Sequence, residues 1–139
     1  MKITYKNVVQ VLKSIAWSKV TKSSTSVRSV VVSPVSDIQS KTKYVARFKI
    51  LSNPSGYETC NCFFGAGAND DVQNISKFYG GTKSLDLTVG KVTEITATFS
   101  VAAGDISSNY DAKFGISGSG AVVNNALNNV TYEVQYYFE

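Results

Sequence analysis

The sequence contains no histidine, and it has only two prolines, two cysteines and one tryptophan in 139 residues. Histidine is the commonest general base, so its absence excludes Ser-His-Asp and Cys-His catalytic sets as well as histidine-bound metals. Cys60 and Cys62 are separated by one residue and have no third thiol to complete a zinc site. A disulfide between strand neighbours two apart is strained. We therefore expect two small buried thiols in a reducing compartment.

Other signatures of catalysis are also missing. The chain has no phosphate-binding loop, dinucleotide fingerprint or zinc-ligand spacing. Glycoside hydrolysis requires two carboxylates that face each other across a cleft. Most of the acidic residues instead fall in predicted turns or in short predicted strands beside them: Asp37, Glu58, Asp70, Asp71, Asp86, Asp105 and Asp111. We therefore expect that the protein is not an enzyme, has no catalytic residues and needs no cofactor.

Long hydrophobic runs are lacking as well. The first apolar stretch, residues 8–17, is interrupted by Gln10, Lys13 and Ser14. No stretch approaches the roughly 20 apolar residues of a transmembrane helix, and none resembles the apolar region of a secretory signal. We expect a protein without a membrane span, located in the cytoplasm at synthesis or in a virion.

The clearest positive signal is alternation along residues 130–138. Its apolar side chains occupy every second position, and only Tyr137 departs from the pattern. Successive side chains of a strand point to opposite sides of a sheet, so this pattern predicts a strand with one dry face. We expect this strand to lie inside a sheet.

Shorter or similar patterns recur along the rest of the chain. Predicted strands cover residues 27–32, 43–51, 57–64, 84–89, 92–101 and 112–116. Residues 2–21 favour a strand, with a short helix as the alternative. Residues 65–71 are predicted to form a loop, and Gly80-Gly81 a break. Eight to nine strands separated by polar turns predict one domain, residues 1–139, folded as an all-β antiparallel β-sandwich of the jelly-roll type.

The net charge of +4 conceals an uneven distribution. Residues 1–49 carry ten basic side chains and one acid, whereas residues 50–139 carry four bases and nine acids. A basic region of one copy could meet an acidic region of another. Alternatively, the two parts of the chain form neighbouring strands in the fold, and their opposite charges offset each other. The lysines are spread out rather than clustered, so nucleic-acid binding is not expected.

From Asp37 onward the strand pattern resembles that of jelly-roll carbohydrate-binding modules. Residues 41–50 resemble the G-x-x-Y-x-x-x-F strand of these modules, and residues 94–101 resemble their y-t-x-t-F-t-V strand. Asn128-Asn-Val130 stands where they often have D-N-V, so Asn128 replaces the acid of that motif. The resemblance implies a sandwich that stacks sugars on exposed aromatic rings. A structural calcium, common in that group, is put in doubt by the missing acid.

Aromatic rings are the remaining candidates for contact with a ligand or partner. The candidates are Trp17, Tyr57, Tyr79, Tyr110 and Tyr137. Such rings can stack on a sugar or fill a pocket in a partner, but they can equally fill the core or an edge. The stretch Asn69-Asp70-Asp71 offers oxygen ligands for calcium, yet adjacent residues of this kind also form turns. We predict no metal site.

Two functions fit these expectations. The first is a structural assembly protein, such as a capsid decoration or fibre-type accessory protein of a phage or virus, with partners that are subunits of a larger assembly or further copies of the chain. It is favoured by a chain that starts with Met, lacks an export signal and shows no catalytic set. The alternative is a carbohydrate-binding module that contacts a glycan through exposed tyrosines.

Overall fold

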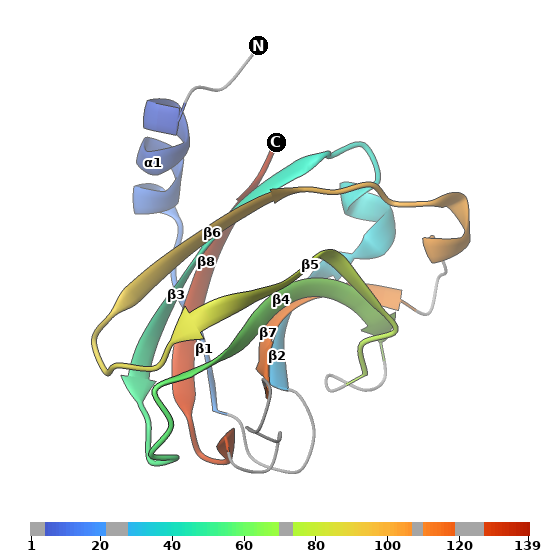
Figure 1. The fold of residues 1–139 in the computed structure, drawn as a ribbon. Coiled ribbons are helices and arrows are strands. Elements are labelled where there is room, and N and C mark those ends of the chain that lie inside the picture. Colours follow the sequence, from blue (N-terminus) through green and yellow to red (C-terminus); the bar gives the residue numbers. More distant parts are fainter. Residues whose placement is uncertain (1–4, 22–27, 70–73, 107–109, 119–126) are drawn as a thin grey trace.

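The computed structural model describes residues 5–21, 28–69, 74–106, 110–118 and 127–139 (Figure 1). In these ranges eight strands form two four-stranded antiparallel sheets, which confirms the predicted all-β sandwich. The elements in chain order are α1 (Tyr5–Ser14), β1 (Ser18–Thr21), β2 (Arg28–Pro34), the 3-10 helix η1 (Val35–Ile38), β3 (Lys43–Ser52), β4 (Thr59–Ala68), β5 (Lys77–Asp86), β6 (Val92–Thr98), the 3-10 helix η2 (Ala103–Asp105), β7 (Tyr110–Ser117) and β8 (Thr131–Phe138). The described chain thus folds into two layers, each of which is one four-stranded sheet.

The strand pairing joins segments from opposite parts of the chain. One sheet, sheet A, has the order β1-β8-β3-β6, and the other, sheet B, has the order β2-β7-β4-β5. Strand β1 pairs with β8, β2 with β7, β3 with β6, and β4 with β5. Two further pairings, β3 with β8 and β4 with β7, join these pairs into sheets. The C-terminal strand therefore lies inside a sheet, as predicted.

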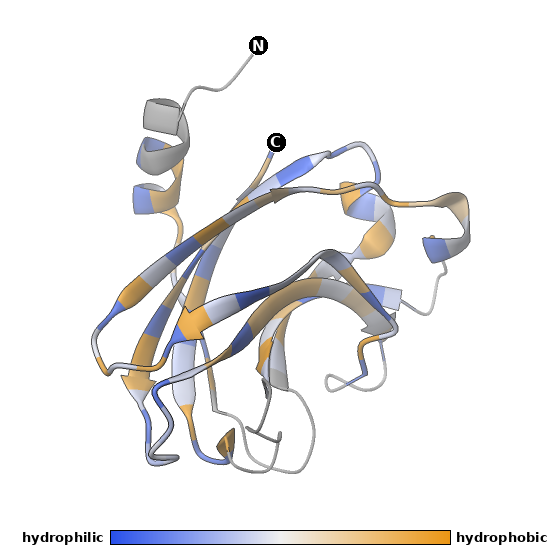
Figure 2. Ribbon diagram, in the orientation of Figure 1, coloured by the Kyte–Doolittle hydropathy of each residue, from blue (hydrophilic) through white to orange (hydrophobic). Residues whose placement is uncertain are grey.

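The core lies between the two sheets and is rich in aromatic rings. Hydrophobic and hydrophilic positions alternate along the strands in Figure 2. On β3 the inward-facing side chains Tyr44, Phe48 and Ile50 are fully buried. Phe64 of β4 stacks on Phe114 of β7 with ring centroids 4.6 Å apart. Burial of these rings on both inner faces is the main force that holds the layers together.

The predicted strand over residues 2–21 is wrong for most of its length. Tyr5–Ser14 forms helix α1, and only Ser18–Thr21 forms a strand. The β-branched content of the segment favours a strand, but propensity is a weak prior that tertiary contacts override. Here Leu12 packs on the outside of sheet A and is completely buried, which the helical spacing of Leu12 and Ile15 permits.

Two predicted interruptions of sheet B are also wrong. Strand β4 continues through Gly65 to Ala68, and β5 runs through Gly80 and Gly81 as a bulge. Both glycines of the bulge have positive φ, +77° and +70°, a conformation that L-residues with a Cβ rarely adopt. The bulge lets Tyr79 point into the core while β5 remains paired with β4 on both sides of it.

Candidate functional site

The five predicted contact residues do not form a common platform. Tyr79 is only 2% exposed and packs in the core, so the expectation that it presents its ring is wrong. Tyr57 is exposed in the turn between β3 and β4, and Tyr110 is half-buried at the start of β7. Trp17 and Tyr137 are half-buried and belong to the segments around sheet A. Among the described rings, no ring contact joins any two of the five.

Tyr79 has a structural role instead. Its hydroxyl donates to Asp105 Oδ2 over 3.3 Å, and Lys77 Nζ donates to the same oxygen over 2.8 Å. The backbone N–H of Ala102 donates to it as well, over 2.9 Å. Partial burial raises the pKa of Asp105, but the hydrogen bonds and the Lys77 charge outweigh burial and lower it on balance. The cluster fastens the η2 segment to β5.

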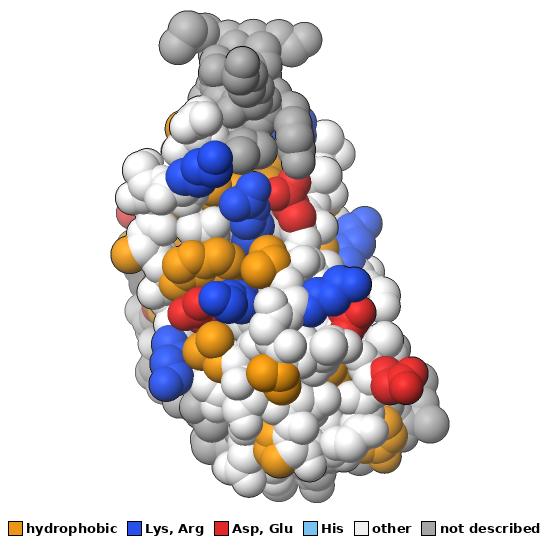
Figure 3. Space-filling view, turned by 90° about the vertical axis from the view of Figure 1, so that its left-hand side faces the viewer, with side chains coloured by type: hydrophobic (Ala, Val, Ile, Leu, Met, Phe, Trp, Pro, Cys, Tyr) orange, Lys and Arg blue, Asp and Glu red, His pale blue; other side chains and the backbone are white. Residues whose placement is uncertain are grey.

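Oppositely charged side chains interleave on the outer face of sheet A. Glu133 of β8 lies between Lys19 of β1 and Lys49 of β3 in the strand register. On the neighbouring row, Arg47 Nε lies 2.9 Å from Glu94 Oε2. Basic, acidic and hydrophobic side chains are accordingly mixed on the face shown in Figure 3. Here the bases of the first third meet acids from later strands, so on this face the charge asymmetry of the sequence is offset by the fold.

Helix α1 is seated on the same face by a small apolar cluster. Leu12 is completely buried and Val45 is 4% exposed, and Ile15 and Tyr137 pack against them. Val45 and Tyr137 are cross-strand partners on β3 and β8. Val45 lies between the charged residues Lys43 and Arg47 on its side of β3, and Tyr137 follows the polar residues Glu133 and Gln135 on its side of β8. We call Val45, Gln135 and Tyr137 the helix seat.

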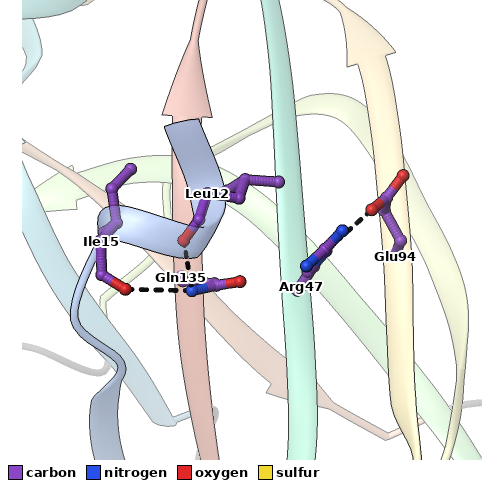
Figure 4. A network of polar contacts seen from close by, with 5 residues as sticks. All are labelled: Leu12, Ile15, Arg47, Glu94 and Gln135. Carbon is purple, nitrogen blue, oxygen red and sulfur yellow. Dashed lines mark hydrogen bonds and ion pairs between the residues drawn. The ribbon is translucent and has the colours of Figure 1, made fainter. Parts of the chain in front are cut away.

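Gln135 is the polar part of the helix seat. Its Nε2 donates to the carbonyl oxygen of Leu12 over 2.8 Å and to that of Ile15 over 3.0 Å (Figure 4). The last carbonyls of a helix have no partners within the helix, so a side-chain amide that supplies two donors satisfies them. Gln135 is itself 3% exposed, because the end of the helix covers it. Arg47 and Glu94 continue the same polar row across β3 and β6.

The described contacts between the end of α1 and the sandwich are smaller than the core between the two sheets. Burial of a leucine contributes about 2 kcal/mol, and each net hydrogen bond contributes about 1 kcal/mol. The two carbonyl contacts of Gln135 and the burial of Leu12 therefore supply about 4 kcal/mol. A domain is stable by about 5–15 kcal/mol. These described contacts hold the end of α1 against the outer face of sheet A.

The helix seat escaped the sequence analysis, although a signal for it was present. Tyr137 is the residue that departs from the alternation of the terminal strand. Val45 departs from the polar side of β3 in the same way, between Lys43 and Arg47. Val45 and Tyr137 are cross-strand partners, so together they form an apolar spot on the outer face of sheet A. Once this register is known, the spot indicates that another segment packs on that face.

The two thiols are free and buried on the inner face of β4. Burial raises the pKa of both Cys60 and Cys62 to about 12. The described residues contain no group of three or more Cys, Asp or Glu side chains arranged to hold a metal ion. Asp70 and Asp71 of the calcium candidate lie outside those residues.

In the part of the chain that the structure describes, no helix has the length and apolar character needed to cross a membrane. Comparisons of the sequence with protein-family models and with curated proteins, and of the fold with solved structures, found no significant match. A function for this protein therefore rests on its fold and on the positions of its side chains.

Proposed function

We propose that this protein is a non-catalytic structural subunit of a larger assembly, an accessory protein of a phage or virus particle such as a capsid decoration or fibre-type protein. The observation that carries the proposal is the strand pairing of β1 with β8, β2 with β7, β3 with β6 and β4 with β5. This is the pairing of one long hairpin rolled into two sheets. We assign the sandwich to the jelly-roll type on this basis.

The link from this architecture to a particle is an analogy of fold. Double-sheet jelly rolls with eight strands recur in viral capsid domains and in lectins. A fold by itself does not define a function, so the side chains have to favour one class over the other. The placement of the aromatic rings supplies that comparison.

The aromatic rings favour the assembly protein over the carbohydrate-binding module. Stacking on a sugar requires an exposed ring face. Tyr79 is in the core, and Tyr137 packs against the apolar cluster below α1. Among the five candidate rings Tyr57 is the most exposed, at 40%, and it stands in the turn between β3 and β4. One isolated tyrosine is a poor basis for a glycan site.

Light scattering and electron microscopy of the full chain over a dilution series test the proposal. We expect oligomers or particles at the higher concentrations. A salt series to about 1 M, where the Debye length is about 3 Å, then identifies the forces at the subunit contacts. Because charges on sheet A are offset within each copy, we expect association to persist at high salt. A monomer at every concentration and salt would contradict the proposal.

A glycan panel examines the alternative directly. We expect no retention of the wild-type protein on immobilised polysaccharides. Retention that is lost in a Tyr57→Ala variant, but kept in a Val89→Ala variant that removes another exposed apolar side chain, would replace the assembly function by glycan binding.

A further inference from the structure

We propose that helix α1 is an exchangeable arm, and that the α1 of one copy occupies the helix seat of a second copy of this chain. The inference deepens the proposed assembly function, on which its biological role rests. It names the partner as another copy and the contact as α1 against Val45, Gln135 and Tyr137. The seat and its occupant are both present in one chain.

The structure itself shows what fits the seat. Leu12 closes the apolar part against Val45, and the carbonyls of Leu12 and Ile15 accept both hydrogen bonds from Gln135 (Figure 4). A second copy carries the identical segment. Every contact made within one chain can therefore be made between two chains, and exchange costs no contact energy.

An empty seat would also attract an occupant. When α1 departs, Val45 and Tyr137 lose their apolar cover, and the Gln135 amide loses both acceptors. The departed helix likewise exposes Leu12 and leaves its terminal carbonyls without these donors. Both halves of the contact are then complementary to the same halves of another copy, because apolar surface and unpaired donors are costly to leave unmatched.

The position of the helix permits this exchange. The side chains of α1 that the structure describes are those of residues 10–14, and of these Leu12 is buried against sheet A, whereas Gln10, Lys13 and Ser14 are exposed. Figure 1 shows α1 standing beside the sheets rather than between them. Residues 15–17 connect α1 to β1, and β1 is fixed from Ser18 onward by pairing with β8. A change of direction in this short connector redirects the whole helix.

Disulfide trapping between two single variants of the full chain tests the exchange. Leu12→Cys and Val45→Cys proteins are mixed at high concentration, diluted and oxidised. Neither variant can form the 12–45 bond alone, so a heterodimer linked at these positions reports a helix in the seat of another copy. Mass spectrometry identifies the linked peptides and excludes Cys60 and Cys62. The matched control replaces Val45→Cys by Val92→Cys, an exposed position on β6 of the same sheet.

We expect at least about tenfold more linked heterodimer from the Leu12/Val45 mixture than from the Leu12/Val92 mixture, because disulfide formation requires close Cα atoms. A second pair, Ile15→Cys with Tyr137→Cys, repeats the test at less buried positions and protects against a misfolded variant. If neither pair exceeds the control, the exchange proposal is overturned.

The outcome is separable from that of the assembly proposal. Linked dimers without larger oligomers would support the exchange and contradict assembly into a particle. Large oligomers from a Leu12→Cys/Val45→Cys double variant that links only within each chain would support assembly and overturn the exchange.

Discussion

Gln135 shows how one side chain decides the position of a whole helix. It occupies the polar side of β8, yet it is almost completely buried because it faces the end of α1. The amide is suited to this place because it is uncharged and offers two donors to two carbonyls. A residue of the same shape that lacks donors should fail there.

We predict that Gln135→Glu releases α1 while the sandwich stays folded. The carboxylate has no proton to donate, and it would face the carbonyl oxygens of Leu12 and Ile15. The free energy of docking should fall by about 1–3 kcal/mol. Limited trypsin digestion at the exposed Lys13 and Lys19 measures the release and should become faster. Gln10→Glu, an exposed position on the same helix, is the control and should digest like the wild type.

At the scale of elements, strand β4 contains two glycines, Gly65 and Gly67, against which the backbone of residues 74–77 packs closely. A Cβ on Gly67 would overlap the backbone carbonyl of Asn74, and one on Gly65 would overlap that of Lys77. These glycines therefore let residues 74–77 lie directly against β4. Lys113 is fully buried nearby and donates to the carbonyls of Ala68 and Asn74, which fixes the same approach.

We predict that Gly67→Ala destabilises the protein by about 1–3 kcal/mol, because overpacking forces the backbone of the covering segment to move. Gly104→Ala is the matched control, since a Cβ at Gly104 meets nothing within 4 Å and should leave stability unchanged. Chemical denaturation monitored by circular dichroism compares the two variants. Equal midpoints for both would contradict the close approach at Gly67.

The same elements explain what the sequence could predict. Alternation located β3, β6 and β8 because each has one face in the core and one outside. Alternation failed at residues 65–68, where the glycines and alanines predict a loop. These residues are small because residues 74–77, which come later in the chain, pack directly against them. Alternation also failed at Gly80-Gly81 because a bulge and a break have the same local composition.

The candidate site was less predictable than the fold. A list of tyrosines does not reveal that Tyr79 packs in the core beside its cross-strand partner Phe64 while Tyr57 faces solvent. The helix seat depends on the pairing of Val45 with Tyr137, which are far apart in the sequence. Cross-strand register is set by the whole sheet and cannot be derived from either strand alone.

At the scale of the whole molecule, the two buried thiols should report global unfolding. Burial raises the pKa of Cys60 and Cys62 to about 12, so almost no thiolate exists in the folded protein at pH 8. We predict no reaction with a thiol reagent in the native state and reaction of both residues in guanidinium chloride. Native-state labelling at a rate that does not change with denaturant would contradict this expectation.

The raised pKa values also give a direction for the dependence of stability on pH. The unfolded state loses its thiol protons near the ordinary value of about 8.5, whereas the folded state retains them to about 12. Their contribution to stability is therefore complete below about pH 8.5 and declines as the pH rises toward 12. A Cys60→Ala/Cys62→Ala variant should show a flatter alkaline decline in its denaturation midpoint.

The pairing of β1 with β8 has a consequence for how the protein is made. Strand β1 precedes the other described strands in the chain, yet its only strand partner in the described part of the chain is β8, which follows all of them. Strand β3 also needs β8 to join it to β1. Sheet A therefore cannot close, and the helix seat, which includes Gln135 and Tyr137, cannot form, before residues 131–138 have been synthesised. Two nascent chains on one messenger therefore have no helix seat for each other's arms until residues 131–138 of one of them have emerged.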